Sequence, residues 1–152
     1  MLSVAADWLA AAGVKAWAAG DAYPWLNTLH LLGLVMLVGA IGVVDLRVAG
    51  AWRALPAAAL SRALTPVAIG GLAIAATTGV CLFAADGSTL AASDVFKLKL
   101  AMLTLALGNA LVFRRMWGRA LDAPPVGARM MATASLALWL AVGLCGRMIA
   151  YQ

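Results

Sequence analysis

The sequence has no glutamate, one histidine, two cysteines and few charged residues of any kind, at 11% of 152. It offers no paired intramembrane carboxylates, no glycine-rich phosphate loop and no nucleophile beside a base, which argues against hydrolytic and phosphoryl-transfer chemistry. Its basic residues are not interleaved with aromatic ones, so a nucleic-acid-binding face is not expected. The common soluble enzyme classes therefore find little support here.

Hydrophobic residues are abundant instead, at 65% of the chain, with a mean hydropathy of +0.98. Such a composition is typical of an integral membrane protein, because roughly 20 apolar residues in a helix cross about 30 Å of hydrocarbon. The connections between the apolar runs are short. We therefore predict an all-α fold, a membrane four-helix bundle forming one transmembrane domain over residues 1–152, with spans at about 25–44, 63–85, 96–113 and 130–150.

The N-terminal segment, at about 2–18, predicts an interfacial helix that lies along the membrane surface. Asp7 precedes its apolar core and Lys15 interrupts it, so a cleaved signal peptide is not expected. Trp8 and Trp17 suit the headgroup zone. At helical spacing, one face carries Leu2, Ala5, Leu9, Ala12 and Ala16.

The arginines predict the orientation in the membrane. The loops after the first and third spans carry Arg47, Arg53, Arg62, Arg114, Arg115, Arg119 and Arg129. By the positive-inside rule both loops are cytoplasmic, and the acidic hairpin "DGSTLAASD" is outside. Both termini are then expected on the periplasmic side of a bacterial inner membrane. This asymmetry, together with attraction to anionic lipid heads, accounts for the net charge of +5.

Polar residues gather in the outer half of the predicted bundle. His30 and Lys99 each lie about five residues inside the outer end of their span, roughly 5 to 9 Å deep. Cys81, Cys145 and Arg147 fall at comparable depth on the other two spans. Ionisable groups inside a membrane are costly, at about 3 kcal/mol each on insertion scales, so their shared depth indicates a common site.

Each of these residues also has a structural interpretation. Arg147 and Lys97 are near enough to the surface to snorkel, which Lys99 does less easily. His30 could bond to a neighbouring helix, through Asn27 or a backbone carbonyl. The cysteines are small enough to pack as buried apolar residues, and the scattered methionines lack the spacing of a copper path.

A single carboxylate, Asp45, falls near the inner end of the first span. Arg47 follows it two residues later. We expect the two to form a local ion pair that closes the cytoplasmic end, in preference to a catalytic centre.

The segments "YPWLNTLHLLGLVMLVGAIGVVDLRVAG", "LSRALTPVAIGGLAIAATTGVCLF" and "DVFKLKLAMLTLALGNAL" resemble a group of small uncharacterised bacterial four-helix membrane proteins. More remotely, they are similar to the CopD copper-resistance membrane domain and to HemJ-type protoporphyrinogen oxidase. In the latter a first-span histidine and a lysine opening a later span recur, and His30 and Lys99 match that pair, with Phe96 at the expected step before the lysine.

The resemblance implies a haem b or porphyrin site, or a copper role, in the outer half of the bundle. His30 would be the metal ligand, and Lys99 and Arg147 would contact the cofactor. Because no second histidine exists, the sixth iron position would be empty, filled by Lys99, Met102 or Met148, or supplied by a second chain.

Function would then be electron transfer or tetrapyrrole oxidation and handling, in a homo-oligomer or beside a partner membrane protein. Two other classes stay open. One is a copper or small-solute transporter with an uptake site of His30, Cys81 and Cys145, and the other is a non-catalytic membrane subunit.

Overall fold

A computed structural model describes residues 2–11, 13–118 and 121–151. Within those ranges the chain is helical and contains no strand, which confirms the all-α prediction. Of the residues named above, Ala12 and Arg119 lie outside the described ranges. The helices are α1 (Leu2–Ala11), α2 (Val14–Ala19), α3 (Tyr23–Ala49), α4 (Ala57–Ala85), α5 (Gly87–Ala92), α6 (Asp94–Trp117) and α7 (Val126–Ile149).

The four long helices α3, α4, α6 and α7 are apolar and long enough to cross a membrane, so the chain is a multi-pass membrane protein. Each extends beyond the predicted apolar run by a few residues at one or both ends. The added segments include charged residues such as Arg47, Arg62 and Asp94, which a hydropathy criterion excludes although a helix can continue through them. Prolines mark three starts, at Pro24, Pro56 and Pro125, and the Ser93 hydroxyl caps α6 by accepting the Phe96 N–H at 3.1 Å.

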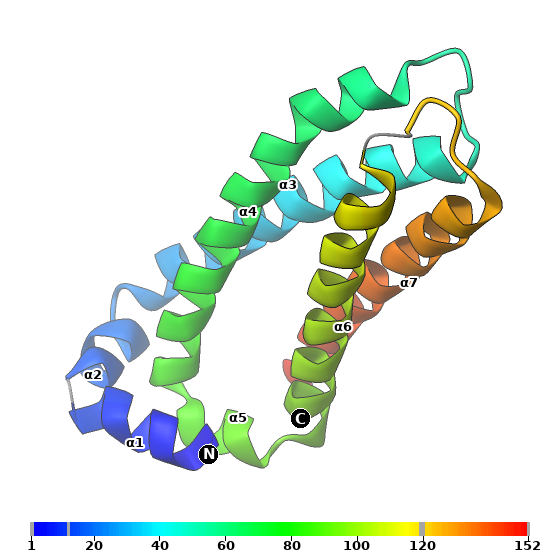
Figure 1. Ribbon diagram of the computed structural model, residues 1–152. Coiled ribbons are helices and arrows are strands. Elements are labelled where there is room, and N and C mark those ends of the chain that lie inside the picture. Colours follow the sequence, from blue (N-terminus) through cyan, green and yellow to red (C-terminus); the bar gives the residue numbers. More distant parts are fainter. Residues whose placement is uncertain (1, 12, 119–120, 152) are drawn as a thin grey trace.

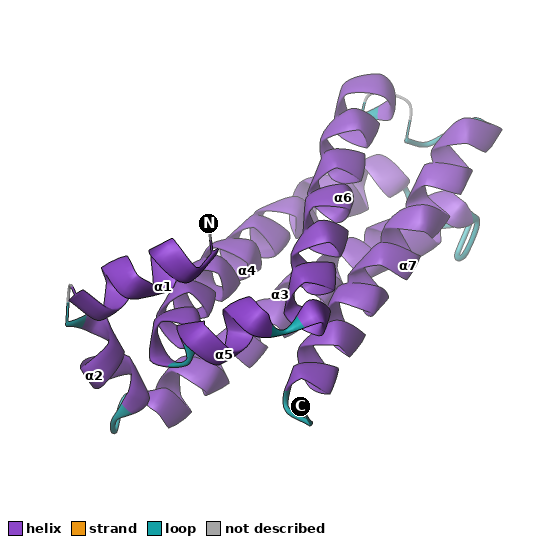
Figure 2. Cartoon of the chain, turned by 90° about the horizontal axis from the view of Figure 1, so that it is seen from below, coloured by secondary structure: helices purple, strands orange, loops and turns teal. Residues whose placement is uncertain are grey.

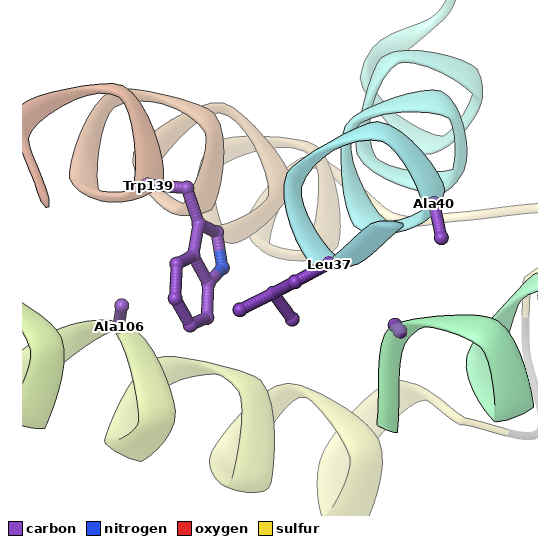
Figure 3. Packing of buried hydrophobic residues seen from close by; sticks show 5 residues of the cluster. Leu37, Ala40, Ala106 and Trp139 are labelled. Carbon is purple, nitrogen blue, oxygen red and sulfur yellow. The ribbon is translucent and has the colours of Figure 1, made fainter. Parts of the chain in front are cut away.

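The long helices pack in the spatial order α4, α3, α7, α6 (Figure 1). Among the described residues, no Cα atom of α4 comes within 8 Å of one in α6, so these two helices are the outer members of the bundle. A central apolar cluster joins all four, with Leu37 and Ala40 from α3, Ala68 from α4, Ala106 from α6 and Trp139 from α7. Figure 3 shows the Trp139 indole reaching towards Ala106 beside Leu37.

Contact between α3 and α4 is the closest in the bundle because glycines face each other across it. A Cβ atom added at Gly71 would lie 2.6 Å from both the Gly33 carbonyl oxygen and the Leu37 nitrogen. Only glycine permits backbones to approach so closely, which is the common way in which helices associate within lipid. The α3–α4 pair is therefore a rigid platform for side chains that face the rest of the bundle.

The N-terminal segment forms two helices, so the prediction of one helix over 2–18 is wrong in this respect. Gly13 separates them with φ of +74°, a left-handed conformation that ends α1. The residues that turn towards the protein also differ, since Ala5 and Ala16 are exposed while Ala18 is fully buried. Trp8 and Trp17 are exposed, as a headgroup location requires.

Both chain ends and the short helices α1, α2 and α5 lie at one end of the bundle (Figures 1 and 2). The connections at 50–56 and 121–125 lie at the opposite end, near the helix ends that carry Arg47, Arg62, Arg114, Arg115 and Arg129. The predicted acidic hairpin contains α5, which lies along α1. The side of the membrane that each end of the bundle faces stays a prediction.

Candidate functional site

His30 lies on α3 with its imidazole turned towards α4. Its Nδ1 atom is 3.2 Å from the Thr78 hydroxyl oxygen, and the backbone of Ala75 also bonds to the ring. The ring lies against Gly79, where an added Cβ would be 3.1 Å from the His30 Cε1 atom. Sequence reasoning named Asn27 or a backbone carbonyl as partner; Thr78 is the side-chain partner found here.

The Thr78 hydroxyl decides which imidazole nitrogen carries the hydrogen. It donates its one hydrogen to the Ile74 carbonyl oxygen, at 2.6 Å, so towards His30 it can only accept. Nδ1 must therefore be the donor, and in the neutral ring the lone pair lies on Nε2. No side chain in the described part of the chain bonds to Nε2. A histidine whose Nδ1 is held by a neighbouring group is oriented in the way that metal-ligating histidines are.

Lys99 lies on α6, partly buried, with its Nζ against α7. An added Cβ at Gly146 would be 3.3 Å from the ammonium nitrogen. The side chain also lies near His30 of α3 and Cys145 of α7. No carboxylate within the described ranges lies at ion-pair distance from it. The Lys99 ammonium group is therefore available to an anionic partner.

His30 and Lys99 are at the same end of the bundle. They lie seven residues from Tyr23 and five residues from Asp94, or roughly 10 and 8 Å along their helix axes. One turn nearer the helix ends, Phe83 of α4 stacks on Phe96 of α6, with ring centroids 5.5 Å apart. Towards the membrane centre lies the cluster around Leu37. The two polar residues therefore occupy a layer between two apolar contacts.

The role of Phe96 was only partly visible in the sequence. Its position before Lys99 was part of the resemblance, but its stacking on Phe83 depends on how α4 and α6 are placed. This stack is a side-chain contact between the two outer helices, and it covers the layer of His30 and Lys99 on the side of the chain ends. It is suited to limiting the access of water.

The other predicted site residues are placed apart from this pair. Arg147 is exposed near the end of α7, where its guanidinium donates to the Tyr151 hydroxyl and lies 4.8 Å from that ring. Lys97 is also exposed and pairs with Asp94 at 2.8 Å, as a surface lysine does. Met148 is exposed at the same helix end, and Met102 is partly buried on α6.

The two cysteines are unpaired and partly buried, Cys81 on α4 and Cys145 on α7. Throughout the described residues, no three side chains of the histidine, cysteine and carboxylate types come together as a metal site. The uptake site of His30, Cys81 and Cys145 that a copper transporter would need is therefore not formed. A single axial histidine, as haem requires, is compatible with this finding because the porphyrin supplies the other ligands.

Asp45 is a second polar feature, and its expected ion pair with Arg47 is wrong. Residues two apart in a helix point to different sides. Asp45 faces Ser135 of α7, is only 7% exposed, and has one carboxyl oxygen without a hydrogen-bond partner. Arg47 instead bonds the carbonyl oxygens of Leu55 and Arg53. The i, i+2 spacing was the signal that could have excluded the pair.

No family model, no curated protein and no solved structure matches the chain. The resemblance to the copper-resistance domain and to the protoporphyrinogen oxidase thus stays a prediction, and the geometry of the site alone carries the argument about function.

Proposed function

We propose that His30 and Lys99 form a haem b or porphyrin site, and that the protein acts in electron transfer or in tetrapyrrole oxidation or handling. The observation that carries the proposal is a histidine inside a membrane-spanning helix whose Nδ1 is held by Thr78 and whose Nε2 has no side-chain partner among the described residues. Ionisable residues within such helices usually face the interior of the bundle and mark a functional site.

The chemical types of these residues suit a tetrapyrrole. His30 would supply one axial nitrogen, and Lys99 would neutralise a propionate carboxylate, since it has no carboxylate of its own. Arg147 could bind a second carboxylate if it gave up its hydrogen bond to the Tyr151 hydroxyl. A bound haem would supply one-electron chemistry. The chain itself orients the imidazole through Thr78 and shields the layer through the Phe83–Phe96 stack.

The same proposal includes location and orientation. We place the chain in a bacterial cytoplasmic membrane, with both termini on the periplasmic side and the site in the outer half. Support comes from the end of the bundle opposite the termini, which carries most of the described arginines: Arg47, Arg53, Arg62, Arg114, Arg115 and Arg129.

One histidine per chain also favours a homo-oligomer or a partner membrane protein, which could supply a second ligand. Helix α6 has room for such a contact, because half of its residues are exposed and Ala106 is the one that is fully buried. A mass measurement in mild detergent that finds only single chains would count against the oligomer.

The site is tested by protein purified in detergent after haem-replete expression. We expect a Soret band and bound tetrapyrrole in the wild type. Lys99→Met should lower cofactor retention or shift the redox midpoint, while Lys97→Met should leave both unchanged because Lys97 pairs with Asp94 on the surface. Equal effects of the two variants would remove Lys99 from the site. A colourless wild type would favour a non-catalytic membrane subunit instead.

A further inference from the structure

A cavity of about 170 Å³ lies at the end of the bundle that carries the basic loops. It is formed where the end of α3 and the connection that follows it meet the segment leading into α7. Arg47, Arg53 and Arg129 line it together with one acidic residue, Asp122. Its volume exceeds that of several water molecules, at about 30 Å³ each, and therefore admits a group of the size of a phosphate.

The one carboxylate of the cavity is already occupied. An oxygen of Asp122 accepts the backbone N–H of Ala58 at 3.2 Å, and thereby caps the start of α4. No ion pair joins any of the three arginines to a carboxylate in the part of the chain that the structure describes. Three arginines and one aspartate therefore leave the cavity with an excess of two positive charges.

The three arginines differ in their surroundings. Arg47 is 7% exposed, and its Nε and Nη2 atoms donate to the carbonyl oxygens of Leu55 and Arg53, which leaves Nη1 without a protein partner. Arg53 folds back over Gly50, so that its guanidinium stays beside the cavity. Arg129 lies in the first turn of α7, where the helix dipole disfavours a cation. An anion in the cavity would give Arg47 Nη1 a hydrogen-bond acceptor and would offset the positive charges of Arg53 and Arg129.

We propose that this cavity, defined by Arg47, Arg53 and Arg129, binds the phosphate group of an anionic phospholipid. Guanidinium groups bind phosphate oxygens through paired, charge-assisted hydrogen bonds. The cavity lies at the ends of membrane-spanning helices, at the level where headgroups are found, and exposed Trp52 on the same connection is of the kind that anchors at that level. These two features favour a lipid over a free phosphate ion.

The test compares two double variants of equal charge. Arg53→Gln/Arg129→Gln removes two arginines of the cavity, and Arg62→Gln/Arg115→Gln removes two exposed arginines that do not line it. Arg47 is left unchanged because it also ties the connection after α3. Lipid binding to delipidated protein is measured by native mass spectrometry with phosphatidylglycerol and with phosphatidylcholine, and inorganic phosphate is titrated separately. Circular dichroism confirms that both variants are folded.

We expect the wild type to prefer phosphatidylglycerol, and the cavity variant to bind it about tenfold more weakly or worse, while the control variant keeps the wild-type affinity. Equal weakening in both variants would show diffuse surface attraction and overturn the site. Equal binding of the two lipids would also overturn it. If inorganic phosphate binds the wild type and loses affinity in the cavity variant while phosphatidylglycerol does not, the lipid assignment is wrong.

Discussion

The glycine contact between α3 and α4 can be tested with two neighbouring glycines. An alanine at Gly71 would place its Cβ 2.6 Å from backbone atoms of α3, which cannot move aside without separating the helices. Overpacking of this kind costs about 1 to 3 kcal/mol of the free energy of unfolding. An alanine at Gly70 would meet no atom within 4 Å, and should gain about 0.5 to 1 kcal/mol because alanine is less flexible than glycine in a helix.

The two variants should therefore change stability in opposite directions. At about 2 to 4 °C per kcal/mol for a chain of this size, their melting temperatures should differ by roughly 3 to 16 °C. Thermal unfolding in one detergent, followed by tryptophan fluorescence, measures the difference directly. Equal melting temperatures would refute the close α3–α4 contact, and with it the platform that presents His30 to Thr78.

Three further predictions follow from the polar residues. Asp45→Asn should leave the melting temperature unchanged or raise it, because a buried carboxyl with an unpartnered oxygen opposes folding; a fall of several degrees would show that the carboxylate has a partner. Asp122→Ala should lower the free energy of unfolding by about 1 kcal/mol through loss of the bond to Ala58, as measured by denaturant titration. Reporter fusions after Arg53 and Arg115 should give cytoplasmic signals, and a periplasmic signal at either would reverse the orientation.

The spans were predictable because length and hydropathy alone fix them, within the few residues that continue into the headgroups. The shared depth of His30 and Lys99 was also predictable, since it requires only counting from the helix ends. Thr78 as the partner of His30 was not, because the rotation of α3 against α4 is decided by the glycine contact at Gly71.

Two other features depended on local detail. The break at Gly13 requires a left-handed φ, which could not be predicted from a weakly amphipathic run of alanines. The arginine-lined cavity forms where Asp122 accepts a hydrogen bond from the start of α4, at Ala58. These two residues are 64 apart in the chain. The first is a local backbone conformation and the second is a tertiary contact, and a hydropathy pattern contains neither.

The imidazole of His30, held through Nδ1 by Thr78, is the feature on which the proposed function rests. The most direct measurement is a haem titration of cofactor-free protein, followed by absorption in the Soret region, for the wild type, His30→Gly and Thr78→Val. We expect a saturable band for the wild type, its loss in His30→Gly with recovery on addition of free imidazole, and a shifted band in Thr78→Val. An identical band in the wild type and His30→Gly, unaffected by imidazole, would contradict the assignment of His30 as a haem ligand.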